Sequence, residues 1–347
     1  MKCTAEHRPL VVSRVLWFIL MASVAGCAIV GQDHVRPELD LSDTWNTQIN
    51  MGLSRSEPDP QDLAAWWRTI EDPALDTLIE IAIEHNLDLK SSLARLRQAR
   101  AARTLASSSL FPAINASGSA SRSSSGSDSG SGSARTRYVA GFDAGWEIDL
   151  FGGVRRSVEA AEADLQARLE QGNDVLVSLT AEVALNYLEL RMYQARLSVA
   201  QRNLEIQEEI FQLEEFRLLS GLSDELTVAQ ARATMENTRA GIPTLHTQIA
   251  QTRNRISVLL GEQPGVLPEA LNVVTPLPSL PIEVATGVPA DILRRRPDVR
   301  QAEQELAAQT ARVGVAQADL YPKFTLVGSI GYESLSLGDL ITAGSRV

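Results

Sequence analysis

The sequence predicts a mixed α/β membrane protein, in which long coiled-coil helical hairpins accompany transmembrane β-strands that belong to a shared barrel. Three observations of the 347-residue chain support this prediction. An apolar residue recurs every seven positions in two runs within 151–260, residues 114–121 and 138–150 alternate between apolar and small or polar side chains, and a 210-residue shift aligns the end of the chain with its first half. Such periods indicate supercoiled helices, strands with one apolar face, and two structural repeats, the second incomplete.

The N-terminal 26 residues have the pattern of a secretory signal, with a basic start and an apolar centre too short for a membrane-spanning helix. The small residues Val24, Ala25 and Gly26 directly precede Cys27. This arrangement resembles the bacterial lipobox, in which lipid is attached to the cysteine, so we expect Cys27 to be a lipidated mature N-terminus. The alternative is a plain signal peptide that leaves Cys27 free or buried.

The composition excludes several classes of function. A net charge of −11 argues against nucleic acid as a partner. The two cysteines, Cys3 and Cys27, and the four scattered histidines have no metal-ligand spacing, and no nucleophile, phosphate loop or catalytic carboxylate pair is recognisable. We therefore predict no enzyme, no metal site, and no cofactor other than the covalent lipid on Cys27.

An extended arm is predicted over residues 27–72, because the segment is polar, contains prolines and has little periodicity. Asp72 and Pro73 form a helix-start signal, an N-cap followed by proline at the first helical position. A helix is expected from there to residue 108, with a break near Asn86.

Residues 112–150 are predicted to form a β-hairpin. The tract 117–133 is rich in Ser and Gly and is expected to be a flexible loop within it. The returning strand has one apolar face, and a membrane barrel requires this alternation, although the same face could also pack on a soluble core. The residues predicted to face lipid are Tyr138, Phe142, Trp146 and Ile148. Two strands cannot close a barrel, so several chains or repeats must share one.

The segment 151–260 is predicted to be a pair of long helices around a sharp turn at residues 220–223. Its unbroken heptads imply a left-handed supercoil, with an ordinary helical bundle as the alternative. Pro243 in the second helix should remove one hydrogen bond and bend it. The heptad positions are Leu169, Leu176, Val183, Leu190, Leu197, Leu204, Phe211 and Leu218, then Val228, Met235, Ile242, Ile249 and Ile256.

The repeats divide the chain into a first unit at 73–263, a proline-rich linker at 264–289 and the start of a second unit at 290–347. The second unit lacks the returning strand and helix pair of the first, so we interpret the chain as a truncated version of a longer design.

A set of motifs in a fixed order resembles the TolC-like outer-membrane efflux factors, most closely the NodT-type lipoproteins of resistance-nodulation-division (RND) systems. The motifs are the Cys27 lipobox, Trp66-Trp67, Asp72-Pro73, Trp146-Glu147-Ile148-Asp149-Leu150-Phe151-Gly152, Arg155-Arg156, Gly241-Ile242-Pro243, Leu260-Gly261, Arg295-Arg296-Pro297-Asp298-Val299, Ala302-Glu303 and Ala318-Asp319-Leu320-Tyr321-Pro322.

This resemblance implies a homotrimer in the outer membrane of a Gram-negative bacterium, lipid-anchored and extending into the periplasm. It implies a passive efflux duct for drugs or other small molecules, coupled through a periplasmic adaptor (membrane fusion) protein to an inner-membrane RND pump. The expected adaptor contact is the helical tip at Arg217, Gly221, Leu222 and Ser223. Two alternatives remain: a non-conducting coiled-coil periplasmic scaffold and a non-functional truncated remnant.

Overall fold

The computed structural model describes residues 29–38, 53–54, 63–124, 134–266, 271, 273–278, 284–285 and 289–346. They divide into two compact units. The strand unit contains the described residues within Met1–Glu38, Leu96–Arg168 and Gln301–Val347, and the hairpin unit those within Leu39–Arg95 and Leu169–Arg300. The predicted signal peptide and Cys27 lie outside the described residues.

The helix predicted over 73–108 is confirmed, as is its break. It consists of α3 (Pro73–His85) and α4 (Leu87–Ser108). The carboxylate of Asp72 caps α3 by accepting a hydrogen bond from the Ala74 N–H at 2.9 Å. Asn86 is buried between the helices, where its Oδ1 accepts from Leu89 N–H at 2.9 Å and its Nδ2 donates to Leu259 O at 3.0 Å. The side chain of Asn86 thus caps α4 and ties it to the last turn of the hairpin.

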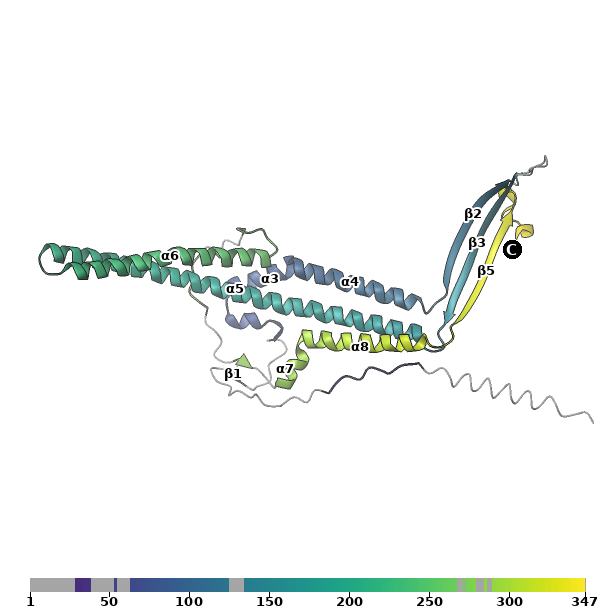
Figure 1. Ribbon diagram of the computed structural model, residues 1–347, viewed down its shortest axis with the longest axis horizontal. Coiled ribbons are helices and arrows are strands. Elements are labelled where there is room, and N and C mark those ends of the chain that lie inside the picture. The colour runs from purple at the N-terminus through teal and green to yellow at the C-terminus, as the bar shows by residue number, and fades with distance from the viewer. Residues whose placement is uncertain are drawn as a thin grey trace, which may run out of the picture. The chain divides into compact units, whose positions relative to one another are not determined.

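The long helix pair is also confirmed, as α5 (Gly153–Leu219) and α6 (Glu225–Leu259) joined at a tight turn (Figure 1). At 1.5 Å per residue, the 67 residues of α5 span about 100 Å. The heptad positions Val183, Leu190 and Ile256 are fully buried, whereas Leu169 is exposed. Helix α6 continues through Pro243, and the bend expected there stays a prediction.

The core of the hairpin unit lies where α3 packs against the middle of α5 and the end of α6. Leu75, Leu78 and Ile79 of α3 are buried together with the heptad side chains. The hydroxyl of Tyr187 donates a hydrogen bond to Asp72 at 2.5 Å, so one carboxylate both caps α3 and joins it to α5. Burial, followed by this hydrogen bond, raises the pKa of Tyr187.

The strand unit contains a three-stranded antiparallel sheet with the order β2-β3-β5. Its strands are β2 (Ala113–Ser124), β3 (Ala134–Ile148) and β5 (Phe324–Ser334). The hairpin is confirmed, but the expectation of a flexible loop over 117–133 is wrong for 117–124, which pairs residue by residue with 134–141. Backbone hydrogen bonds to β3 hold these small side chains in a strand, which composition alone does not reveal. Residues 125–133 lie outside the described part.

The second repeat has the same order of elements as the first. Helices α7 (Pro289–Arg295) and α8 (Pro297–Ala318) precede β5, and the break at Arg296 falls 210 positions after that at Asn86. Arg296 and Asp298 form an ion pair, and Asp298 also accepts from the Val299 N–H. This agrees with the interpretation of these charges as a helix start.

The predicted arm and linker contain short elements that the sequence pattern did not indicate. Strand β1 (Leu53–Ser54) pairs in parallel with β4 (Val284–Ala285) and so joins the arm to the linker. A 3₁₀ turn, η1 (Trp66–Ile70), precedes α3, and two more, η3 (Leu337–Asp339) and η4 (Ala343–Ser345), follow β5.

Candidate functional site

The turn between α5 and α6 contains all four residues predicted for the helical tip. Gly221 has a φ of 72°, in the left-handed region that favours glycine. Its N–H donates to Leu218 O at 2.9 Å, and the Leu222 N–H donates to Arg217 O at 2.7 Å. This pair of bonds is a Schellman motif, which satisfies the last carbonyl groups of α5 and reverses the chain. The backbone of the tip is therefore fixed by Gly221.

The polar side chains of the tip are held by Glu214, a residue that the sequence did not single out. Its carboxylate accepts from Arg217 Nη1 at 3.0 Å and from Ser223 Oγ at 2.9 Å, and its side chain is only 14% exposed. On the other side of the turn, Asp224 caps α6 by accepting from the Thr227 N–H at 2.8 Å. That backbone hydrogen bond lowers the pKa of Asp224. The tip is thus ordered by contacts of its own.

Large apolar side chains surround this turn in full exposure, and Leu219 reaches 83%. Only Leu222 among them was predicted from the sequence. The sequence contains a signal for the others, because they are apolar at positions outside the heptad and lie next to a turn. At such positions the partner helix of the pair does not cover an apolar side chain, so it stays exposed. The exposed apolar residues of the tip are Phe216, Leu219, Leu222 and Leu226.

The register of the sheet places the four residues predicted to face lipid on one face. Phe142 lies opposite Ala116 and Ile330, and Trp146 lies opposite Leu326. Residues opposite one another in paired strands share a face. From Ile114 to Ala120 of β2, and at the paired positions of β3 and β5, this face has no charged side chain. On the same stretch the opposite face has mostly Gly and Ser, with Val139, Asp143 and Glu333 among them, and Glu147 follows farther along β3.

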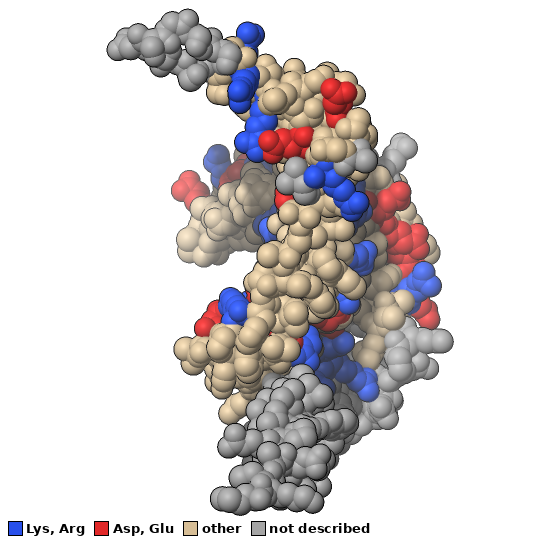
Figure 2. Space-filling model, turned by 90° about the vertical axis from the view of Figure 1, so that its right-hand side faces the viewer, with Lys and Arg blue, Asp and Glu red and all other residues tan. Residues whose placement is uncertain are grey.

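The arginines of the three described strands lie near the hairpin end. Arg122, Arg135 and Arg137 belong to the last residue pairs before the connection of β2 to β3, and Arg137 pairs with Glu333 of β5. Figure 2 shows blue and red side chains together at the top of the view and a wider tan area below them. A charge-poor middle with charges at its end is the distribution expected for a strand that crosses lipid.

The lower end of the sheet joins the helices at a well-ordered junction. Asp149 follows β3 directly, and its carboxylate accepts from the backbone N–H groups of Val154 at 3.2 Å and Arg155 at 2.9 Å. The Arg155 side chain also donates to it from Nε at 3.1 Å. Asp149 thereby caps the N-terminus of α5 and fixes the angle at which strand becomes helix.

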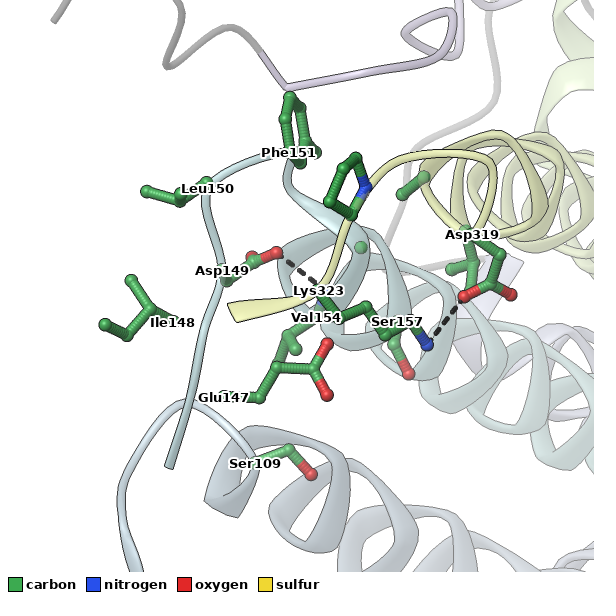
Figure 3. A pocket seen from close by; sticks show the side chains of 14 residues that line it. Ser109, Glu147, Ile148, Asp149, Leu150, Phe151, Val154, Ser157, Asp319 and Lys323 are labelled. Atoms are coloured by element: carbon green, nitrogen blue, oxygen red, sulfur yellow. Dashed lines mark hydrogen bonds and ion pairs between the residues drawn. The ribbon is translucent and has the colours of Figure 1, made fainter. Parts of the chain in front are cut away.

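A cavity of about 300 Å³ opens at this junction (Figure 3). Its walls come from the end of β3, the first turn of α5 and the end of α8. The charges that line it are largely used within the protein, because Lys323 pairs with Asp319 at 2.8 Å and Asp149 is bonded as above. Phe151 stacks on Tyr321 with ring centroids 4.7 Å apart and joins the two repeats beside the cavity.

Asp149→Asn is expected to make the protein less stable near neutral pH. Burial raises the pKa of Asp149, but the hydrogen bonds from Arg155 and Val154 outweigh it, so the pKa lies below its ordinary value of 3.8. The carboxylate therefore contributes stability above pH 3.8, and this contribution disappears as pH falls through the lower folded-state pKa.

The measurement is the melting temperature of purified wild type and variant between pH 3 and pH 7. The difference between them should be constant above about pH 5 and should shrink below about pH 4. A difference that is independent of pH would show that the charge of Asp149 has no role in stability.

No group of three or more metal-ligating side chains lies close together in the part of the chain that the structure describes. Among the same residues, no helix is both long and apolar enough to cross a membrane.

Comparison with known proteins agrees with this geometry. Residues 78–262 and 288–346 match the family profile "Outer membrane efflux protein". The chain is 32% identical to Nodulation protein T of Rhizobium leguminosarum bv. trifolii over 88% of its own length and 64% of that protein's, so it spans less than two thirds of this relative. It is 30% identical to the cation efflux system protein CusC of Escherichia coli (strain K12), over 96% of this chain and 71% of CusC.

The fold has a counterpart among solved structures. The outer-membrane channel OprN is similar with a TM-score of 0.83 and 35% identity, over 92% of this chain and 71% of OprN. The predicted fold class, long helical hairpins combined with outer-membrane barrel strands as in TolC-like channels, is thereby confirmed, as is the resemblance on which it was partly based. The chain belongs to the outer membrane efflux protein family.

Proposed function

We propose that this chain is the outer-membrane channel component of a tripartite efflux pump and forms a passive exit duct for drugs or other small molecules. In this proposal three copies share one barrel, and their helical hairpins extend into the periplasm. The observation that carries it is the uncharged face across three hydrogen-bonded strands in a member of this family.

The sheet gives a physical reason for assembly. Strands β2 and β5 each have one neighbour within the described sheet, so each has an outer edge without a strand partner there. Backbone groups left unpaired in lipid each cost several kcal/mol, so a sheet of this kind must close with other strands. In the proposed homotrimer the other copies contribute strands toward this closure, and Tyr138, Phe142, Trp146 and Ile148 face lipid.

The helical tip and the N-terminus support two of the proposed partners, the periplasmic adaptor and the membrane lipid. An ordered turn surrounded by exposed apolar residues suits a protein contact, and we assign Arg217, Gly221, Leu222 and Ser223 to the periplasmic adaptor. The adaptor links the duct to an inner-membrane RND pump, which supplies the energy. Lipid on Cys27 anchors the chain to the outer membrane, and the chain itself is not an enzyme. The name of CusC, a cation efflux protein, supports small solutes as the cargo class.

The deciding experiment is single-channel recording in planar bilayers with protein purified from outer-membrane fractions. We expect heat-sensitive trimers and stepwise conductance that does not depend on an energy source. A water-soluble monomer released by Cys27→Ser, without conductance in any preparation, would instead favour the periplasmic scaffold.

A further inference from the structure

A buried arginine, Arg156, makes most of the hydrogen bonds that hold the chain following Cys27 against the strand unit. Residues 29–38, here the N-terminal strap, contain neither helix nor strand and lie against the start of α5 and the end of α8. The Val30 N–H donates to Phe151 O at 3.0 Å. Arg156 donates to the strap from Nε to Val30 O and from Nη2 to Gly31 O, each at 3.1 Å.

Arg156 is only 3% exposed, so its charge must be neutralised within the protein. Nη2 donates to Asp33 at 2.7 Å, and Nη1 donates to Glu159 of its own helix at 2.7 Å. Three of these four acceptors therefore belong to the strap. A guanidinium without them would be a buried charge with most of its donors unpaired, so the strap and Arg156 depend on each other.

Three glycines from separate segments make the room for this contact. A Cβ on Gly31, whose φ is 98°, would lie 2.6 Å from the Cα of Gly314. A Cβ on Gly152 would lie 2.7 Å from the side chain of Ile29, and one on Gly314 would lie 3.1 Å from that of Arg156. Close packing of the strap therefore requires a glycine in the strap itself, one directly before α5 and one in α8.

The strap continues past the buried arginine along α8. Arg36 pairs with Glu303 at 2.8 Å, and the carboxylate of Glu303 is only 16% exposed. The strap is thus bound to the first repeat through α5 and to the second repeat through α8.

We propose that Arg156 is a positioning residue that holds the membrane anchor beside the end of the barrel strands. This inference rests on the proposed lipid at Cys27. Val30 is three positions after Cys27, and a fully extended chain over three residue steps reaches at most about 11 Å. Val30 is bonded to Phe151, which lies three positions after the last residue of β3. The acyl chains then insert into the membrane leaflet that contacts this end of the strands, and the strap keeps the anchor next to the barrel.

The test is limited digestion of lipidated trimers in outer-membrane fractions with endoproteinase Asp-N, which cleaves before aspartate. In the wild type, the bond between Gln32 and Asp33 should resist cleavage, because Arg156 holds the strap at Gly31 and Asp33 on either side of it. Arg156→Gln removes the charged guanidinium, and we expect cleavage before Asp33 to become at least tenfold faster while the trimer stays heat-sensitive and intact. Loss of overall stability would instead expose sites throughout the chain, so selective cleavage separates positioning from simple stability.

A second variant leaves the arginine in place. Gly31→Ala puts a Cβ against Gly314 and strains a residue with positive φ, so it should displace the strap and also speed cleavage before Asp33 at least tenfold. Arg103→Gln is the matched control, because Arg103 forms an exposed ion pair with Glu162 of α5 at 2.8 Å, and it should behave as wild type. Cleavage within twofold of wild type in both Arg156→Gln and Gly31→Ala would overturn the proposal.

The mass of the released N-terminal peptide separates this proposal from the one on which it rests. An acylated Cys27 in the wild type and in Arg156→Gln supports the anchor, and selective cleavage then assigns its positioning to Arg156. A wild-type peptide without acyl mass refutes the lipid anchor and with it the positioning role, even where the cleavage rates show that Arg156 still binds the strap.

Discussion

Phe142→Arg is expected to abolish insertion of the protein into the outer membrane. Phe142 lies in the middle of the uncharged face, opposite Ala116 and Ile330, and is 59% exposed in the single chain. An arginine on the lipid face near the bilayer midplane costs about 2–4 kcal/mol. In a trimer this amounts to roughly 6–12 kcal/mol, comparable to the whole stability of a typical domain. The amount of heat-sensitive trimer in outer-membrane fractions measures the effect.

Ser329→Arg is the matched control. Ser329 is next to Ile330 in β5, so it lies at the same depth as Phe142 but on the opposite face, directly opposite Asp143. A new arginine there can pair with that carboxylate, and we expect trimer yields close to those of the wild type. Normal insertion of Phe142→Arg together with failure of Ser329→Arg would mean that the other face of the sheet contacts lipid.

Gly221→Pro is expected to remove adaptor binding without reducing membrane insertion. Proline fixes φ near −65°, whereas Gly221 has 72°, and it lacks the N–H that donates to Leu218 O. Such a change costs about 3 kcal/mol or more where the backbone cannot adapt. The tip must then rearrange, and Leu222 loses its place. Site-specific cross-linking to the periplasmic adaptor should fall to below a tenth of the wild-type yield.

Two further variants separate the causes at the tip. Gly221→Ala meets no atom within 4 Å, so only the strained φ remains, at about 1–2 kcal/mol, and cross-linking should fall only partly. Arg217→Glu places a second carboxylate beside Glu214 and should weaken cross-linking, whereas Arg202→Glu, an exposed charge swap elsewhere on α5, should not. Wild-type cross-linking in both Gly221→Pro and Arg217→Glu would show that the adaptor does not contact this turn.

Local periodicity predicted most of the elements because each one follows from neighbours in the sequence. The heptads from Leu176 to Leu218 predicted α5, and the cap at Asp72 and the pair Pro297-Asp298 marked helix starts. The Ser/Gly tract is the instructive failure. Ser117–Ser124 has a composition typical of loops, yet its strand is decided by hydrogen bonds to residues 134–141 of β3, a partner that composition does not reveal.

The contacts at the helical tip and at the N-terminal strap likewise divide into those that the sequence predicted and those that it did not. Gly221 and its turn were predictable, because a glycine between two heptad runs marks a chain reversal. Glu214 was not, since a glutamate on a charged helix is ordinary until the turn brings Ser223 back beside it. Arg156 appeared only as part of a family motif, and its burial depends on a strap more than 110 residues earlier in the chain.

The amino-acid sequence by itself determined the long helices, the alternating strands, the repeat and the family, because period, caps and motifs are properties of neighbouring residues. Only the tertiary structure decided how β5 of the second repeat pairs with β3 of the first, which side chains surround Glu214, and what neutralises Arg156. These contacts join residues far apart in the chain, and their energies arise from burial and hydrogen bonds that exist only once the segments have come together.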